Sequence, residues 1–172
     1  SLTNDTRLHL GARKQKVELD VTNTNLSTST VTSSSKNDSL SAWDIALQHD
    51  VSDNFSLHAR VAKSFRFPVL DEIWSYFSGS ISLLEVQTGT HLELGSKYRI
   101  SNNSTLSIDA FQIDNENEIG YNAATFSNVN FDDTQHRGIN IKLTKQVISN
   151  WLLNLNYGYR DAEFTAGIYT GN

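Results

Sequence analysis

The feature that most constrains this chain is a repeated alternation of apolar and polar residues with a period of two. The stretch NFSLHARVAKS, from Asn54, puts Phe, Leu, Ala and Val at one parity and mostly polar residues at the other. Segments 137–145 and 151–160 show the same pattern. Successive side chains of a strand lie on opposite faces, whereas a helix would mix the two sets around its circumference. The chain is therefore predicted to be all-β.

Seven long strands account for the alternating segments. Strands in soluble domains usually have about five or six residues, and these are longer. Their length fits strands that cross a bilayer at a tilt. The expected strands cover residues 6–20, 39–50, 54–65, 89–101, 104–115, 134–148 and 151–164.

The connections between these strands alternate between short and long. The short ones are DVSDN, SNNS and ISNW, and the long ones cover residues 22–39, 66–88 and 116–133. In an up-and-down antiparallel sheet, alternate connections fall at opposite ends. All short turns then lie at one end and all long loops at the other, which is typical of bacterial outer-membrane barrels.

The strand positions opposite the apolar ones include charged residues, which a dry protein core could not hold. A soluble interior would need partners for each of these charges, whereas a water-filled lumen needs none. The alternation therefore favours an antiparallel up-and-down transmembrane β-barrel segment of about seven strands, with short periplasmic turns and long extracellular loops. A β-sandwich with one solvated face also alternates and is the alternative. The polar residues are Glu93, Lys97, Arg99, Asn140, Lys142, Asn154, Asn156 and Arg160.

Composition excludes several classes of protein. The 172 residues include no cysteine, which excludes a disulfide scaffold and thiolate metal sites. A net charge of −5 disfavours nucleic acid as a partner. No stretch has the apolar length of a transmembrane helix. The absence of methionine, even at position 1, indicates a piece of a longer protein.

No catalytic motif is present in the sequence, so an enzyme is not predicted. The patterns of serine hydrolases, zinc peptidases, P-loops and dinucleotide sites are all missing. His91 and Glu93 share one strand face, and we interpret them as lumen polarity rather than as metal ligands. No metal and no cofactor are predicted.

Five segments resemble TonB-dependent outer-membrane receptors, and they occur in the order found in that family. They are ARVAKSFRFPVLDEIW, LEVQTGTHLELGSKY, IDAFQIDNENEIGY, FSNVNFDDTQHRGINIKL and LNLNYGYRDAEFTAG. Asn140 departs from the pattern, because the family usually has Glu two residues after the glycine of HRG. The resemblance covers most of residues 39–172. It implies a barrel of about 22 strands, of which residues 1–172 form a part, without the plug domain and the last strands.

The resemblance also implies a function in the bacterial outer membrane. Such a receptor takes up a metal complex (a ferric siderophore, haem or cobalamin) with energy coupled through the TonB protein, which would engage the missing N-terminal part. The expected partners are a metal-chelate ligand, TonB and outer-membrane lipid. The alternatives are a passive porin-like barrel and a soluble β-sandwich adhesin or carbohydrate-binding module. The isolated chain, with two open sheet edges, is expected to self-associate edge to edge.

The long loops supply the candidate ligand contacts. The segment SFRFPVLDEIW contains the only proline, Pro68, which cannot donate to a sheet ladder and is tolerated where a strand ends. Aromatic rings and an arginine beyond it could hold a planar anionic metal chelate by stacking and charge. The same residues could instead form an aromatic girdle or pack loop against loop. The candidates are Arg66, Trp74, Tyr76, Phe77, Tyr121 and Phe126.

Overall fold

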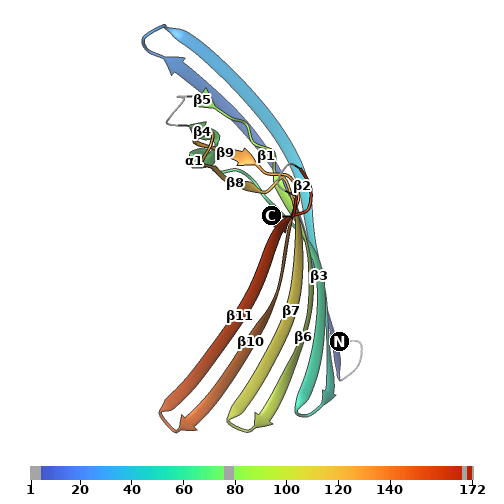
Figure 1. Ribbon diagram of the computed structural model, residues 1–172. Helices are drawn as coiled ribbons and strands as arrows, with labels where there is room; N and C mark the ends of the chain where they lie inside the picture. Colours follow the sequence, from blue (N-terminus) through green and yellow to red (C-terminus); the bar gives the residue numbers. More distant parts are fainter. Residues whose placement is uncertain (1–4, 76–79, 168–169, 172) are drawn as a thin grey trace.

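The computed structural model describes residues 5–75, 80–167 and 170–171, most of which belong to one curved antiparallel sheet (Figure 1). Seven long strands pair in the order β1-β2-β3-β6-β7-β10-β11. Each strand follows its neighbour in the chain, apart from the short elements inserted between β3 and β6 and between β7 and β10. The strands are β1 (Thr6–Asn25), β2 (Thr30–Ser52), β3 (Phe55–Arg66), β6 (Gln87–Ser101), β7 (Ser104–Glu116), β10 (Thr134–Ile148) and β11 (Trp151–Phe164).

The connections are sorted as the sequence predicts. Tight turns at 53–54, 102–103 and 149–150 lie together at one end of the sheet, the turn end. The other connections lie at the opposite end, the loop end (Figure 1). The predicted all-β, up-and-down arrangement of seven strands is confirmed. The described residues form no second large sheet facing the first, so the β-sandwich alternative is wrong.

The expected long loop at 22–39 is wrong, because most of it is strand. Strands β1 and β2 stay paired as far as Asn25 and Thr30, and only residues 26–29 form the turn. The Asn25 side-chain oxygen accepts hydrogen bonds from the backbone of Ser27 (3.0 Å) and Thr28 (3.3 Å). A polar composition suggested a loop, but threonine and valine favour strands and no glycine or proline interrupts them. The result is a hairpin that extends far beyond the other strands (Figure 1).

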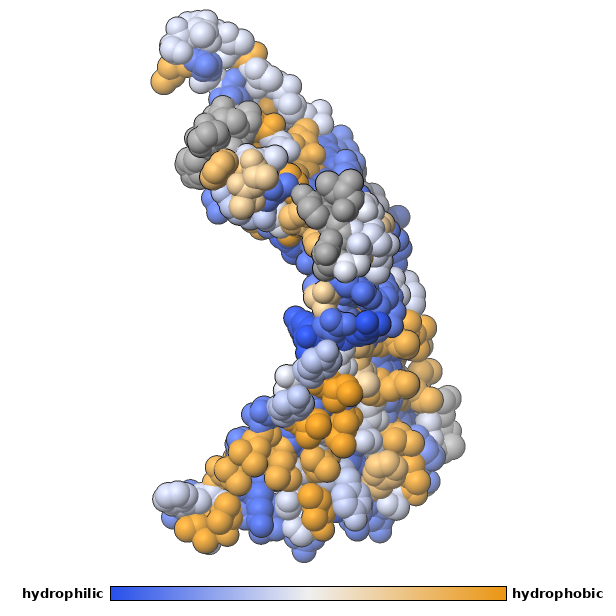
Figure 2. Space-filling view, viewed as in Figure 1, coloured by the Kyte–Doolittle hydropathy of each residue, from blue (hydrophilic) through white to orange (hydrophobic). Residues whose placement is uncertain are grey.

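The two faces of the sheet differ in polarity. On the convex face, the strand register aligns Leu57 with Ser96 and Ile108, and the row above aligns Leu94 with Ile139 through Ala110. These apolar side chains are largely exposed, as in Leu94 at 58% and Leu57 at 45%. Figure 2 shows hydrophobic residues gathered over the lower part of the sheet, with a hydrophilic band above them. An outward apolar band of this kind is what a barrel wall presents to lipid.

The concave face carries two folded loops at the loop end. The 67–86 loop contains α1 (Leu70–Ile73), β4 (Trp74–Ser75) and β5 (Ser80–Ile81). The 117–133 loop contains β8 (Ile119–Asn122), paired with β9 (Ser127–Asn130). No helix in the described part of the chain is long and apolar enough to cross a membrane.

Most of the buried apolar side chains belong to these loops rather than to the sheet. Their burial indicates that the loops are packed against the rest of the chain rather than extended into solvent. Ile73 is 3% exposed, Leu84 5%, Val86 7% and Ile119 8%. Ala62, on the sheet itself, is 4% exposed.

Candidate functional site

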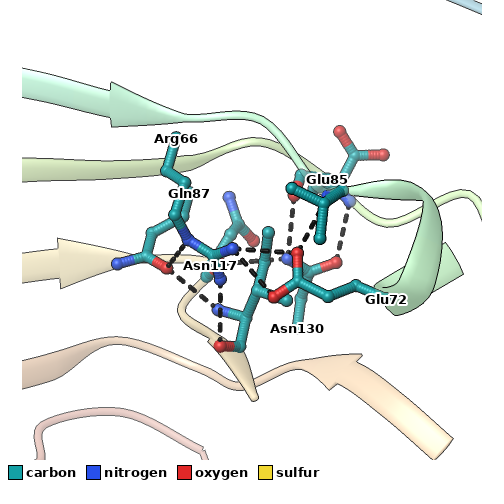
Figure 3. A network of polar contacts seen from close by, with 8 residues as sticks. Arg66, Glu72, Glu85, Gln87, Asn117 and Asn130 are labelled. Carbon is teal, nitrogen blue, oxygen red and sulfur yellow. Dashed lines mark hydrogen bonds and ion pairs between the residues drawn. The ribbon is translucent and has the colours of Figure 1, made fainter. Parts of the chain in front are cut away.

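Arg66, the last residue of β3, connects the sheet to both loops (Figure 3). One guanidinium nitrogen donates to both carboxylate oxygens of Glu72 at 2.8 Å. The Nε of Arg66 donates to the side-chain oxygen of Gln87 at 3.4 Å, and its second terminal nitrogen donates to the carbonyl oxygen of Ile119 at 3.3 Å. The Gln87 side-chain oxygen also accepts the Ile119 backbone N–H at 3.2 Å. Arg66 therefore has a defined structural role, and its predicted contact with a ligand stays a prediction.

Glu72 explains how the chain turns after Pro68. Its carboxylate accepts the Val69 backbone N–H at 2.9 Å, which holds the start of the short helix α1. Burial alone raises the pKa of Glu72, but the Val69 hydrogen bond and the Arg66 guanidinium outweigh it and lower that pKa below its ordinary value. Glu72 therefore stays ionised and keeps its bond to Arg66.

Asn130 joins the two loops directly (Figure 3). Its side-chain oxygen accepts the Glu85 backbone N–H at 2.8 Å, and its amide nitrogen donates to the Glu85 carbonyl at 3.0 Å. The same nitrogen donates to the Asn117 carbonyl at 2.9 Å. The Asn130 side chain therefore both accepts from and donates to the backbone of the 67–86 loop, as the backbone of a neighbouring strand would.

Lys36 fastens the long β1–β2 hairpin to the 67–86 loop. Its ammonium donates to the Leu84 carbonyl at 2.8 Å and lies 2.9 Å from the Glu85 carboxylate. Glu85 thus contacts the hairpin with its side chain and the 117–133 loop with its backbone. The hairpin and the two loops form one connected polar network.

Glu118 anchors the 117–133 loop to the top of β10. Its carboxylate accepts hydrogen bonds from Thr134 and from Asn115 (3.3 Å), and it lies 3.1 Å from His136 Nε2. Burial raises the pKa of Glu118, but the hydrogen bonds from Thr134, His136 and Asn115 together lower that pKa below its ordinary value. The carboxylate is therefore held as the charged acceptor of this cluster.

The predicted aromatic contacts lie apart from one another. Trp74 borders a hollow of about 390 Å³ together with Val21, Leu70, Ile73 and Ile81. Tyr121 (59% exposed) and Phe126 (55% exposed) lie on the β8–β9 hairpin, away from that hollow's lining. Tyr76 and Phe77 lie outside the described residues.

Below the loops, the concave face is lined by paired polar groups. His58 Nε2 lies 3.4 Å from Glu93 and 3.2 Å from Asp109, and Arg60 donates to Asp44 at 2.5 Å. Glycine at position 95 leaves room for the contact between His58 and Asp109, because a Cβ there would overlap both side chains.

Another predicted residue of this face, His91, also has a protein partner. His91, read from the sequence as lumen polarity, shares a hydrogen bond of 2.7 Å with Ser64. Within the described ranges, no group of three histidine or acidic side chains is arranged to hold a metal ion.

The sequence pointed to the loop aromatics and to Arg66, but not to the other polar anchors. Asn130, Glu85 and Glu118 are ordinary loop residues in the sequence, and only the fold brings their partners together. Glu72 had a local signal, because an acidic residue three positions after the start of a helix can accept that residue's backbone N–H. The other anchors had no such signal.

Comparison with known proteins agrees with this architecture. The family model described as "TonB dependent receptor-like, beta-barrel" matches residues 1–172. No curated protein sequence matches the chain. The siderophore receptor PiuA from Acinetobacter baumannii is 20% identical with a TM-score of 0.74, over 95% of this chain and 24% of that one.

Two further structures are similar over the same region. The copper transporter OprC is 17% identical with a TM-score of 0.72, over 95% of this chain and 27% of that one. The ferric yersiniabactin uptake receptor FyuA from Yersinia pestis is 16% identical with a TM-score of 0.72, over 95% of this chain and 25% of that one. This chain therefore spans about a quarter of the length of these structures.

The whole-chain match to the family model, the seven-stranded wall and the sorted connections all agree. The chain belongs to the TonB-dependent receptor family, as part of its β-barrel domain.

Proposed function

We propose that this chain is part of an outer-membrane receptor that takes up a metal complex with energy supplied through TonB. In this proposal the plug domain and the last strands lie outside residues 1–172. The similar structures are described as receptors or transporters for siderophores and copper. These descriptions make a metal complex the first class of cargo to test, with ferric siderophores, haem, cobalamin and copper complexes as the candidates.

One observation carries the proposal: two folded loops cover the concave face of a polar-lined wall at the loop end. A passive pore has no need of loops that are fixed over its mouth by Arg66, Lys36 and Asn130. Fixed loops can present side chains to a ligand with little loss of conformational freedom on binding. This arrangement suits capture of a scarce solute before transport.

The proposed ligand contacts are the loop aromatics and Arg66. Trp74 borders an apolar hollow of a size that admits part of a chelate, while Tyr121 and Phe126 expose rings on the neighbouring hairpin. Stacking of rings on a planar chelate and charge from an arginine are the expected interactions. The full proposed set is Arg66, Trp74, Tyr76, Phe77, Tyr121 and Phe126.

An uptake experiment tests this function. The intact receptor is produced in cells that lack their own receptors, and uptake of labelled ferric siderophores, haem, cobalamin and a copper complex is measured with and without TonB. We expect TonB-dependent uptake of one class. Trp74→Ala and Tyr121→Ala should raise the KM for uptake, whereas Tyr159→Ala, on the outward face of β11, should not.

The passive alternative gives a different result in the same experiment. A porin-like barrel would admit small solutes at a rate proportional to their concentration, with no effect of removing TonB. Uptake that continues unchanged without TonB would therefore replace the proposed function with the passive one.

A further inference from the structure

The register of the sheet maps the outward face into rows that run around the wall. One row joins Leu8, Leu47, Ala59 and Leu94, and the row above it joins Leu10, Ile45, Val61 and Leu92. Both rows are aliphatic on these four strands. Towards the loop end, the next row is no longer aliphatic, and we call it the boundary row. The boundary row consists of Ala12, Trp43, Lys63, Thr90, Asp114, Gln135 and Glu163.

The boundary row and the positions above it divide into a basic and an acidic half. On β1–β3, Lys63 lies beside Trp43, and Lys14 stands one row higher, opposite Ser41. On β7, β10 and β11 the corresponding outward positions are mostly acidic. One row lower, Arg137 pairs with Asp161 at 2.9 Å. The acidic positions are Asp114, Glu116 and Glu163.

Two of the three lysines of the basic half have no partner within the part of the chain that the structure describes. Lys14 and Lys63 are exposed, and no hydrogen bond or ion pair is found for either among the described residues. Lys16, the next outward position on β1, differs because it pairs with Glu18 at 2.5 Å. Arg7, Arg60, Arg66 and Arg137 also have carboxylate partners. Unpaired ammonium groups therefore occur at this level of the outward face.

Position and charge together identify a partner. A lysine just above an apolar band can lay its aliphatic stem on that band and extend its ammonium into the head-group layer. Tryptophan prefers the same level, where its ring is half apolar and half polar. An unpaired ammonium there is complementary to an anionic phosphate, and the acidic half of the row repels the same group.

We propose that Lys14 and Lys63, with Trp43 beside them, form a contact site for the phosphate groups of lipids in the outer leaflet of the membrane. The site lies on the β1–β3 part of the wall only, so lipid is held on one side of the receptor. This inference rests on the membrane location in the proposed function, but not on its cargo.

Binding of a phosphorylated lipid by the intact receptor tests the site. The detergent-solubilised receptor is titrated with lipid A carrying both phosphates, and in parallel with the same lipid after removal of its phosphates. We expect the double variant Lys14→Gln/Lys63→Gln to bind the phosphorylated lipid about thirtyfold more weakly at low salt, since two lysines that each contribute about 1 kcal/mol near such a surface together contribute about 2 kcal/mol. The lipid without phosphates should not distinguish the two proteins.

Matched variants separate this site from general charge effects. Lys145→Gln removes an outward lysine at the turn end, opposite Leu153, and should leave binding unchanged. Lys14→Arg/Lys63→Arg keeps both charges and should retain binding, which also controls for folding. Equal binding by wild type and the double glutamine variant would overturn the inference, and so would an equal loss in Lys145→Gln.

Two further arms identify the source of the phosphate and keep the two proposals distinct. Inorganic phosphate at the lipid concentration should not compete, and full competition would overturn the assignment to lipid. A receptor that binds the lipid but takes up no metal complex would refute only the proposed function. A receptor that takes up a metal complex but is indifferent to these lysines would refute only the lipid site.

Discussion

At the scale of the residue, Arg66 can act on a ligand directly or through the loops that it holds, and two variants separate these roles. Glu72→Gln weakens the Arg66 contact and the start of α1 but leaves the guanidinium in place. If Arg66 acts only through the loops, both Arg66→Ala and Glu72→Gln should weaken ligand binding by a similar amount, about 1 kcal/mol for one partly exposed charged contact.

Direct contact between Arg66 and the ligand predicts a different pattern. Because the proposed cargo includes anionic chelates, we expect Arg66→Ala to cost at least tenfold more in affinity than Glu72→Gln, measured by titration of the intact receptor. Arg99→Ala, at the turn end of β6, is the control and should change nothing. Equal losses in the first two variants would assign Arg66 to loop anchoring alone.

Glu118 predicts that the anchor of the 117–133 loop depends on pH. Its pKa in the folded protein is lowered from the ordinary value of 4.5, so the ionised form is the one that the fold stabilises. This contribution is fully present above pH 4.5 and is lost as the pH falls through the lowered pKa. We expect protection of the Ile119 and Phe131 amides from hydrogen exchange, corrected for intrinsic rates, to fall over that acidic range.

A substitution isolates the carboxylate that causes this loss. Glu118→Gln removes the titrating group, so protection of the loop should be lower at neutral pH and should no longer fall on acidification. Glu116→Gln removes a carboxylate on the outward face, two residues away in the sequence, and should keep the wild-type pH dependence. A pH dependence that survives in Glu118→Gln would assign the effect to another group.

At the scale of the element, the long strands could be predicted and the loops could not. Strand positions follow from local alternation, and the seven predicted strands overlap the seven observed ones. The hairpin above residue 20 was missed because its serine, threonine and asparagine residues are as common in loops as in exposed strands. The short elements α1, β4, β5, β8 and β9 depend on partners from distant segments, such as Asn130 with Glu85, which no local pattern records.

The Asn130 contact predicts that the two loops respond as one element. Asn130→Ala removes the hydrogen bonds to Glu85 and Asn117, so we expect faster hydrogen exchange in both the 67–86 and the 117–133 loop. Each exposed hydrogen bond contributes about 0.5–1.5 kcal/mol, so the loss of all three should lower the free energy of opening by about 1.5–4.5 kcal/mol. Asn122→Ala, which loses a bond within its own turn, should affect the 117–133 loop alone. Faster exchange confined to one loop in Asn130→Ala would contradict the coupling.

At the scale of the whole molecule, the wall is a stable surface only when its edges are paired. Among the described strands, β1 and β11 each have one neighbour in the sheet, so each presents a row of backbone groups at the edge. The outward face adds exposed Leu10, Leu94 and Tyr157. Few side chains of the sheet are buried, because in a barrel lipid and lumen, rather than a second layer, cover the two faces. The strands of the wall could therefore be predicted from the sequence, because the polarity of each side chain depends only on which of the two faces it occupies.

The open edges predict how residues 1–172 behave when they are produced alone. Unpaired strands associate with other strands, and backbone groups inside lipid or detergent must be satisfied. We expect the refolded chain in detergent micelles to form dimers or larger species whose mass, measured by light scattering, rises with protein concentration. Cysteine pairs placed across β1 and β11 of different molecules should crosslink, whereas pairs placed across two tight turns should not. A chain that stays monomeric at millimolar concentration, with no crosslinks between edges, would show that the two edges satisfy each other within one molecule, and the open wall would then not be its form in isolation.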